Sequence, residues 1–240
     1  MLRLESDARP RSILFDIDGT LVRFRGGFAP FNATVASVFG VPVDIRTIRA
    51  DGMTDPEILA RLLDAAPPRN GGVTPRLLAR FEAQLASALA TGIATGEVAI
   101  ESLPGALELV GALATRADCR LGIVTGNLRS TARVKLRAAR LEGFFAAGGY
   151  GSDSPARAVL PGLAVERLGR ALGAPLDPRA GVMVGDTPHD LAAARAHGMR
   201  CVLVATGQYT ARELAVAAPD VLLPDLGDLD AALAAIGLGA

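Results

Sequence analysis

Two aspartates near the N-terminus are the side chains of this sequence best suited to chemistry. Asp16 and Asp18 follow the apolar run at residues 13–15, and Gly19 comes directly after them. In an extended segment alternate side chains point the same way, so both carboxylates emerge on one side of a strand end, while Gly19 permits a sharp turn. Two like charges so close raise each other's pKa unless a cation stabilises them. The pair therefore predicts a divalent metal site that faces an anionic substrate.

A solvated turn is the alternative interpretation of this segment. An EF-hand loop that began at Asp16 would need an acidic residue at its fifth position and Glu at its twelfth. The sequence has Thr20 and Gly27 there, so it does not favour an EF-hand. A solvated turn stays open at this point.

Composition limits the partners of such a site. Half of the 240 residues are hydrophobic, 25 basic residues balance 25 acidic ones, and Trp is absent. These values predict a folded domain that binds a small anion and no nucleic acid. Cys119 and Cys201 adjoin strand-like runs and are expected to be buried thiols. Residues 1–9 lack the apolar core of a secretory signal and no run approaches a membrane span, so we expect a cytoplasmic protein without a membrane partner.

Apolar runs and helical patterns alternate along most of the chain. The runs lack polar alternation, which is typical of parallel strands buried on both faces. They lie at residues 13–15, 121–124, 182–184, 201–205 and 221–223. Helical patterns lie at residues 107–115, 130–141, 163–172 and 190–196. The alternation predicts an α/β fold with a doubly wound, mostly parallel Rossmann-like sheet.

One interval contains only helical patterns. They lie at residues 31–39, 57–65 and 76–90, without a comparable strand run. This predicts an all-helical cap domain at residues 23–100, inserted into a Rossmann-like catalytic core formed by residues 1–22 and 101–240. The Pro- and Gly-rich segment 67–72 is expected to be a loop within the cap.

Further polar residues follow the second and third strand runs, where open α/β sheets bind ligands. Thr125, Gly126 and Asn127 offer a hydroxyl, an unobstructed backbone N–H and an amide before a helix, a set suited to phosphate. An ordinary capped turn is equally compatible with this tripeptide. Asp186 and Asp190 are four residues apart and can converge on one ion, although Asp190 could serve only as a helix cap.

Three segments together resemble a known family. DIDGT at 16–20, TGN at 125–127 and GDTPHD at 185–190 are similar, in type and order, to motifs of the haloacid dehalogenase superfamily, phosphatase branch with a helical cap. Phosphoglycolate phosphatases and β-phosphoglucomutases are of this kind. The predicted insertion lies where the family carries its cap, and the resemblance covers essentially the whole chain.

The resemblance implies a Mg²⁺-dependent hydrolase that acts on a small phosphorylated metabolite through an aspartyl-phosphate. Asp16 would be the nucleophile. Asp18 would be the general acid and base and would offer its backbone carbonyl to the metal. Asp186 would complete the metal site, with Asp190 as a ligand or an outer partner. The segment 125–127 would bind phosphate.

The sequence departs from the family at one position. The family uses a basic residue, usually Lys, between the second and last motifs, but no Lys follows Lys135. Lys135 lies within a helical pattern and is interpreted as solvated or helix-supporting. Arg157 is the candidate for the basic residue, because a guanidinium can neutralise carboxylates, although its geometry differs from that of Lys. An exposed Arg at a helix start is the alternative.

The substrate stays undetermined at this level. Arg49, Thr54 and Asp55 lie in a predicted helix break of the cap and are candidates for substrate contact, with a turn or cap role as the alternative for each. The motifs separate a phosphatase poorly from a phosphomutase acting on a sugar phosphate. The missing Lys also leaves open a catalytically weak regulatory or binding protein. Nothing in the sequence distinguishes a monomer from a homodimer.

Overall fold

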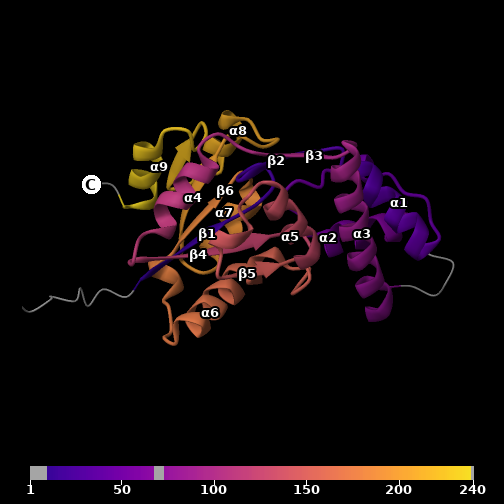
Figure 1. Cartoon of the computed structure of the whole chain (residues 1–240), viewed down its shortest axis with the longest axis horizontal. Helices are drawn as coiled ribbons and strands as arrows, with labels where there is room; N and C mark the ends of the chain where they lie inside the picture. The colour runs from indigo at the N-terminus through magenta and orange to yellow at the C-terminus, as the bar shows by residue number, and fades with distance from the viewer. Residues whose placement is uncertain (1–9, 68–72, 239–240) are drawn as a thin grey trace, which may run out of the picture.

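The computed structural model describes residues 10–67 and 73–238. The predicted loop at 67–72 falls outside these residues apart from Pro67, as does the segment 1–9. Figure 1 shows helices α1 and α3 at one end of the molecule and the strands of the large sheet at the other. The strands are β1 (Arg11–Phe15), β2 (Val22–Arg25), β3 (Ala99–Ser102), β4 (Cys119–Thr125), β5 (Ala147–Tyr150), β6 (Val182–Gly185), β7 (Arg200–Val204) and β8 (Val221–Leu223). The α-helices are α1 (Phe28–Phe39), α2 (Asp55–Ala65), α3 (Pro75–Thr95), α4 (Ala106–Ala114), α5 (Arg129–Ala138), α6 (Leu160–Leu172), α7 (Pro188–Arg195), α8 (Ala211–Val216) and α9 (Leu229–Ile236).

The large sheet has six strands in the order β5-β4-β1-β6-β7-β8, and all neighbours are parallel. The predicted doubly wound α/β fold is confirmed, and its five predicted strands are all present. The sixth strand, β5, was not predicted. Its sequence is Ala-Gly-Gly-Tyr, and two glycines remove the apolar side chains that mark a buried strand.

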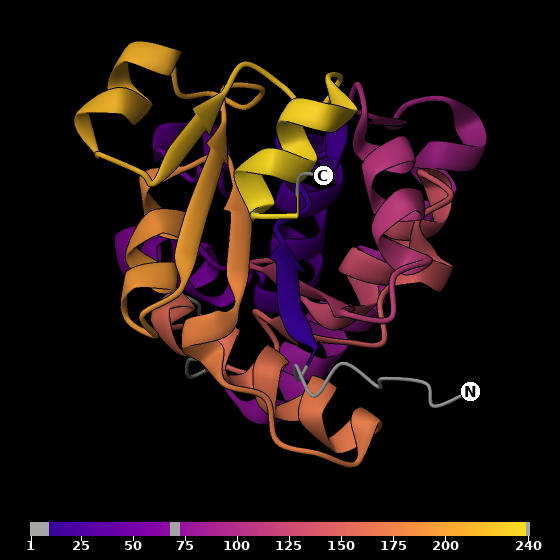
Figure 2. The ribbon, with the colours of Figure 1, turned by 90° about the vertical axis from the view of Figure 1, so that its left-hand side faces the viewer.

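Both faces of this sheet are buried, which explains the continuous apolar runs. In β1, Ile13 and Phe15 pack in a cluster with α4, α5 and α9, whereas Leu14 packs in a cluster with α6, α7 and α8. Figure 2 shows the strands of the core between these helices. All three of these β1 side chains are fully buried, so β1 is packed on both sides up to the residue before Asp16.

The strand order reverses at β1. The chain builds β4 and β5 on one side of β1, then crosses to β6, β7 and β8 on the other. Ligands of open α/β sheets bind at such a switch point, beyond the carboxyl ends of the strands. Asp16, the Thr125 end of β4, and Asp186 all lie at this edge, because β1 is paired with β4 and with β6 in parallel register.

Helices α1, α2 and α3 form a hydrophobic cluster of their own. Its centre is Phe81, whose ring meets Phe31 at a centroid distance of 5.4 Å and Phe39 at 6.0 Å. The chain enters and leaves this helical part through β2 and β3, which pair antiparallel. These four-residue strands, VRFR and AIES, were not predicted because charged residues interrupt each of them. The division at residues 22/23 and 100/101 stays a prediction, and it falls within this pair of strands.

The two cysteines and the hydrophobicity of the helices complete the description of the fold. Cys119 and Cys201 are buried free thiols, as predicted. Among the helices of the described residues, none has the length and apolar character needed to cross a membrane.

Candidate active site

The end of β1 places Asp16 and Asp18 at the switch point. Asp16 is buried, with 5% of its surface exposed, whereas the side chain of Asp18 is 36% exposed. Gly19 then turns the chain with a φ of +81°, a value that favours glycine. A Cβ on Gly19 would lie 2.3 Å from Asp186 Oδ2, so glycine at this position also leaves room for the second carboxylate.

Asp186 and Asp190 come from β6 and the first turn of α7. Thr187 is the N-cap of α7 and forms a capping box with Asp190. Asp190 Oδ2 accepts hydrogen bonds from the Thr187 hydroxyl (2.8 Å) and from the backbone N–H groups of Thr187 (3.0 Å) and Asp186 (3.2 Å). Asp186 Oδ1 accepts a hydrogen bond from Thr20 at 3.1 Å. Asp190 therefore does serve as a cap, and it also orients the backbone that carries Asp186.

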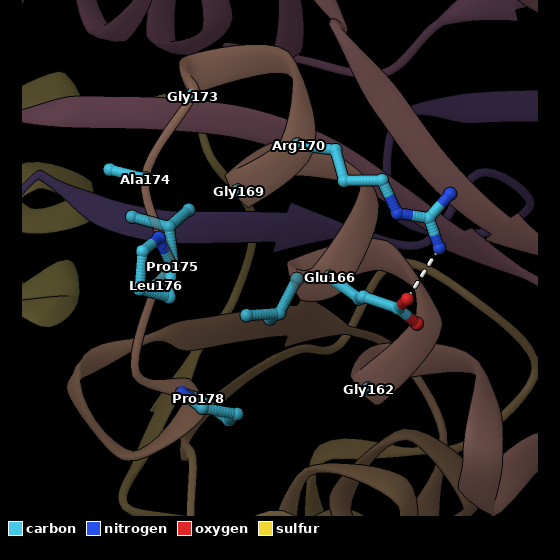
Figure 3. Close-up of a pocket in the computed structure, with 10 residues that line it drawn as sticks. Gly162, Glu166, Gly169, Arg170, Gly173, Ala174, Pro175, Leu176 and Pro178 are labelled. Atoms are coloured by element: carbon cyan, nitrogen blue, oxygen red, sulfur yellow. Dashed lines mark hydrogen bonds and ion pairs between the residues drawn. The ribbon is translucent and has the colours of Figure 1, made fainter.

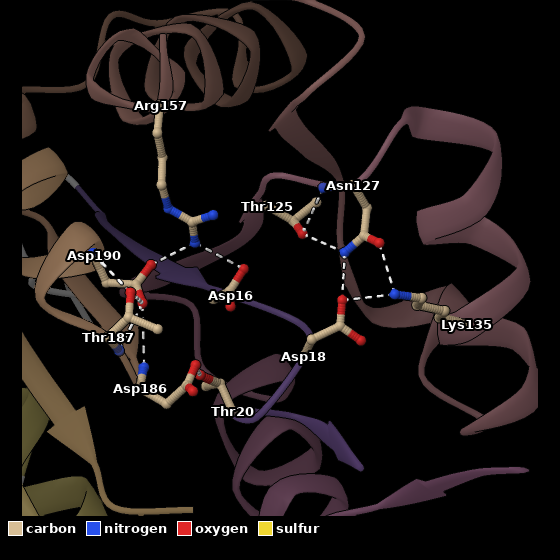
Figure 4. A network of polar contacts seen from close by, with 10 residues as sticks. All are labelled: Asp16, Asp18, Thr20, Thr125, Asn127, Lys135, Arg157, Asp186, Thr187 and Asp190. Carbon is tan, nitrogen blue, oxygen red and sulfur yellow. Dashed lines mark hydrogen bonds and ion pairs between the residues drawn. The ribbon is translucent and has the colours of Figure 1, made fainter. Parts of the chain in front are cut away.

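Arg157 contacts one aspartate at the end of β1 and one in α7. It begins the 3-10 helix Arg157–Val159, and only 8% of its side chain is exposed. Its Nη2 donates to Asp190 Oδ1 at 2.5 Å and lies 3.0 Å from Asp16 Oδ1 (Figure 4). His197 Nε2 contacts the carbonyl of Ala158 at 2.8 Å and so holds the segment that carries Arg157. The alternative of an exposed helix-start Arg is wrong for this residue.

Burial and crowding perturb the protonation of this group. Burial raises the pKa of Asp16 to about 7, an effect that Arg157 opposes and that Asp190 and Asp18 reinforce. Burial likewise raises the pKa of Asp186 well above its usual range, and the nearby Asp16 and Asp190 add to the shift. Burial disfavours the charged form of Arg157, but Asp190 and Asp16 together raise its pKa above the usual value. Arg157 is thus one buried positive charge beside three buried carboxylates, too little to neutralise all three if they are ionised.

The donor set fits a divalent cation. One carboxylate oxygen from each of Asp16, Asp186 and Asp190 lies within 4.8 Å of the others, and all three residues are buried. Oxygen donors of this kind suit Mg²⁺. Because both oxygens of Asp190 already accept hydrogen bonds, Asp16 and Asp186 are the members best placed to bind the ion directly. These residues could hold a divalent metal.

The segment at the end of β4 lies beside Asp18. Asn127 Nδ2 donates to Asp18 Oδ2 (2.7 Å) and to Thr125 Oγ1 (2.7 Å), and the Asn127 N–H also reaches Thr125 Oγ1 (3.2 Å). The Thr125 hydroxyl accepts in these contacts, so its own hydrogen is available to an anion. All of these side chains are 8% exposed or less, apart from Asp18.

Lys135 lies in the site, so its interpretation as a solvated or helix-supporting residue is wrong. Only 4% of the surface of Lys135 is exposed, and its Nζ donates to Asp18 Oδ2 at 2.6 Å and to Asn127 Oδ1 at 2.7 Å. It is neither solvated nor a simple helix-supporting residue. A signal was present, because Lys135 shares the buried face of α5 with Thr131, Ala132 and Leu136. A charged residue on the apolar stripe of a helix needs a buried partner.

A cleft of about 580 Å³ opens above these residues. Its floor is Asp16, Asp18 and the segment 125–127, and its opposite wall is largely apolar. That wall comes from the helical part of the chain and includes Phe28, Phe31, Ile45, Met53 and Ile58. A second hollow of about 490 Å³ runs along α6 (Figure 3), but its charged residues, Glu166 and Arg170, pair with each other. The first cleft therefore holds the candidate chemistry.

Three residues of the helical part are candidates for substrate contact, with a turn or cap role as the alternative, and all three contact the core. Thr54 is fully buried, caps α2, and donates to the carbonyl of Pro155 at 2.9 Å. Asp55 lines the cleft, and its Oδ2 accepts from the N–H of Leu128 at 2.9 Å. Arg49 is outside the cleft lining and stacks over the ring of Tyr209, 4.1 Å from its centroid. Whether they touch a substrate stays a prediction.

Glu82 of α3 makes a similar contact that the sequence did not reveal. Its Oε1 accepts from the N–H (3.0 Å) and hydroxyl (2.9 Å) of Ser130 and from the hydroxyl of Ser152 (3.1 Å). Asp55 and Glu82 thus place two carboxylates at the first turn of α5, where a helix attracts negative charge. Through these hydrogen bonds, α2 and α3 of the helical part contact the segment that follows β4.

The buried carboxylate of Asp55 allows the energetic effect of this contact to be tested. Burial raises the pKa of Asp55 from 3.8 to about 6, while Lys135 and the Leu128 N–H oppose the shift and Asp18 and Glu82 add to it. Because the folded state disfavours the ionised form, this group stabilises the fold fully below about pH 4 and loses that contribution as the pH rises through 6. We expect Asp55→Asn to remove this dependence. Its unfolding free energy, relative to the wild type, should rise by roughly 2 kcal/mol between pH 4 and pH 7.

Urea denaturation at several pH values measures this difference. Asp64→Asn is the matched control, because Asp64 lies on the same helix but is exposed. Parallel pH profiles for wild type and Asp55→Asn would contradict the prediction.

Comparisons with known proteins agree with this geometry. A family model described as haloacid dehalogenase-like hydrolase matches residues 10–198. The chain is 32% identical to a phosphoglycolate phosphatase of Rhodospirillum rubrum over 82% of this chain and 80% of that protein. It is 30% identical to a phosphoglycolate phosphatase of Synechococcus elongatus over 91% of this chain and 95% of that protein.

A solved structure is similar over nearly its full length. The crystal structure of CbbY from Rhodobacter sphaeroides in complex with phosphate has a TM-score of 0.69 and 26% identity, and the match covers 95% of this chain and 100% of that one. The matched family model spans β1 to α7 and so includes all four aspartates, Arg157 and the β4 end. The chain belongs to the haloacid dehalogenase-like hydrolase family of enzymes, in its phosphatase branch.

Proposed function

We propose that this protein hydrolyses a small phosphomonoester through a phosphorylated Asp16, with Mg²⁺ as its metal. The observation that carries the proposal is the meeting of Asp16, Asp186 and Asp190 with Arg157 beyond the ends of β1 and β6. A carboxylate and a phosphate repel each other, and this group offers both a nucleophile and the oxygens that bind a neutralising ion.

The reaction would take two steps at Asp16. A carboxylate oxygen of Asp16 attacks phosphorus, the bond between phosphorus and the ester oxygen breaks, and the departing oxygen takes a proton from Asp18. Water then gives a proton to Asp18 while its oxygen attacks phosphorus, and the bond from phosphorus to Asp16 breaks. Inorganic phosphate leaves, and both aspartates return to their starting forms.

Asp16, Asp186 and the backbone carbonyl of Asp18 would hold the metal, and Asp190 would act as an outer partner through its contacts to Arg157 and Thr187. The bound ion would neutralise charge on the phosphoryl oxygens. The Thr125 hydroxyl and the N–H of Gly126 would bind the remaining phosphate oxygens. Asn127 would contribute by orienting Thr125 and Asp18.

Phosphoglycolate is the first substrate to consider, because two relatives carry the name phosphoglycolate phosphatase. Its carboxylate would need a cation outside the reacting group. Arg23 and Arg25 both line the cleft, but Arg25 pairs with Glu101 at 3.1 Å. Within the described residues Arg23 makes no ion pair, so Arg23 is our candidate for the carboxylate. A small phosphorylated metabolite in the cytoplasm is the partner that this proposal requires.

A panel of phosphomonoesters that includes phosphoglycolate and several sugar phosphates tests the function. We expect phosphate release with Mg²⁺ and at most about one hundredth of that rate after chelation with EDTA. Release of an isomer without phosphate would indicate a phosphomutase. A folded protein that binds Mg²⁺ but turns over no ester would indicate a regulatory or binding protein.

A further inference from the structure

Lys135 is a buried ammonium in the middle of the site. It is the single Lys of the sequence and is 4% exposed. Burying such a charge is costly unless all of its donors are used. Two donors meet Asp18 Oδ2 and Asn127 Oδ1, and Nζ also lies 3.9 Å from the centroid of the Phe24 ring. The contacts are directional, so they fix the place of Nζ.

The same contacts fix one oxygen of Asp18. Oδ2 accepts from both Lys135 (2.6 Å) and Asn127 Nδ2 (2.7 Å). Oδ1 is buried and has no hydrogen-bond partner among the described residues. Figure 4 shows the Asp18 carboxylate on the Lys135 and Asn127 side of the site, while Arg157 lies on the Asp16 side. Oδ2 of Asp18 is therefore held by two hydrogen bonds, whereas Oδ1 of the same carboxylate has none from the described residues.

Two cations also divide the charge of the site between them. Arg157 contacts Asp16 and Asp190, whereas Lys135 contacts Asp18. Phe24, which covers the Lys135 ammonium, belongs to β2 and packs against the hydrophobic cluster of α1, α2 and α3. Lys135 thus lies between the strand that leads into the helical part and the carboxylate at the end of β1.

We infer that Lys135 is a positioning residue for Asp18. Together with Asn127 it holds Oδ2, so that Oδ1 is left to exchange protons with the departing oxygen and the attacking water. This inference rests on the proposed function, because it assigns Lys135 to the acid and base of that reaction. It does not place Lys135 in contact with substrate.

The two chemical steps depend on Asp18 to different degrees, and this gives a specific test. A p-nitrophenolate ion leaves without a proton, so phosphorylation of Asp16 by p-nitrophenyl phosphate needs little from Asp18. Hydrolysis of the phosphorylated Asp16 needs Asp18 as a base whatever the substrate. In Lys135→Met we expect near-normal release of the first equivalent of p-nitrophenol. Later turnover should be about 100-fold slower than in the wild type, with phosphorylated protein accumulating after an acid quench.

An alkyl phosphate supplies the second arm. Its leaving oxygen needs a proton, so Lys135→Met should slow the first turnover as well, and by a similar factor. Arg133→Met is the matched control, because Arg133 lies on α5 but its side chain is 64% exposed and pairs with Glu142. That variant should behave as the wild type with both substrates. Lys135→Gln, whose amide can still donate to Asp18, should retain more turnover than Lys135→Met.

Several results would overturn the inference. One is a Lys135→Met variant that matches Arg133→Met. Another is a Lys135→Met variant with an unchanged melting temperature in which phosphorylation and dephosphorylation of Asp16 are slowed equally, with the aryl as with the alkyl substrate. If Lys135→Met and Lys135→Gln both fail to fold, Lys135 is a structural residue and the assignment is wrong. Failure of the proposed function is distinct, because the wild type itself would then form no phosphorylated protein and release no phosphate.

Discussion

Asp16→Asn is expected to lower phosphate release by about 10⁵-fold or more while leaving the fold intact. Asn keeps the shape of the side chain but removes the oxygen anion that would attack phosphorus. The substitution also removes one of three clustered carboxylates. Burial has raised the pKa of this carboxylate, Asp16, to about 7. We therefore expect the melting temperature in EDTA to equal or exceed that of the wild type.

Steady-state phosphate release and thermal melting together measure this result. Asp177→Asn is a suitable control, because Asp177 is exposed and lies before β6, at the opposite end of that strand from Asp186. An Asp16→Asn variant that kept one hundredth of the wild-type rate would exclude Asp16 as the nucleophile. Loss of the folded state would instead assign Asp16 a structural role.

Arg157→Met should have the second largest effect, and it should affect stability as well as rate. Arg157 is 8% exposed and directly contacts both Asp16 and Asp190. Without it, Asp16 and Asp190 lose the cation that they contact, and the cluster that they form with Asp186 loses its buried positive charge. Removing one partner of a buried ion pair costs about 3–5 kcal/mol of stability. Loss of a preorganised charge at the reacting group costs about 10²- to 10³-fold in turnover.

Mg²⁺ distinguishes the two effects. Because the ion would bind the same carboxylates, we expect millimolar Mg²⁺ to restore part of the lost unfolding free energy of Arg157→Met but not its turnover. Arg179→Met, at an exposed position, is the control. The expected loss of stability is larger than for Lys135→Met, since Asp18, the partner of Lys135, is itself 36% exposed and can be solvated. A stable Arg157→Met variant in EDTA would contradict this account of the site.

From the sequence alone, five of the six strands of the large sheet and the polar residues at three of their ends could be predicted. Apolar runs such as those in β1 and β6 were visible because both faces of the sheet are covered, so that every side chain in them must be apolar. Asp16, the segment 125–127 and Asp186 were visible because they end such runs, and strand ends at a switch point meet in space.

Which cation contacts which carboxylate could not be predicted from the sequence, because it depends on how distant segments pack together. Lys135 and Asp18 are 117 residues apart, and Arg157 and Asp190 are 33 apart. Local periodicity reports that a position is buried, but it carries no information about the partner that a buried charge meets. The same reason applies to Asp55 and Glu82, which reach α5 from the helical part of the chain. Strands β2, β3 and β5 likewise depend on pairing with distant segments, since their own side chains are too charged or too small to mark them.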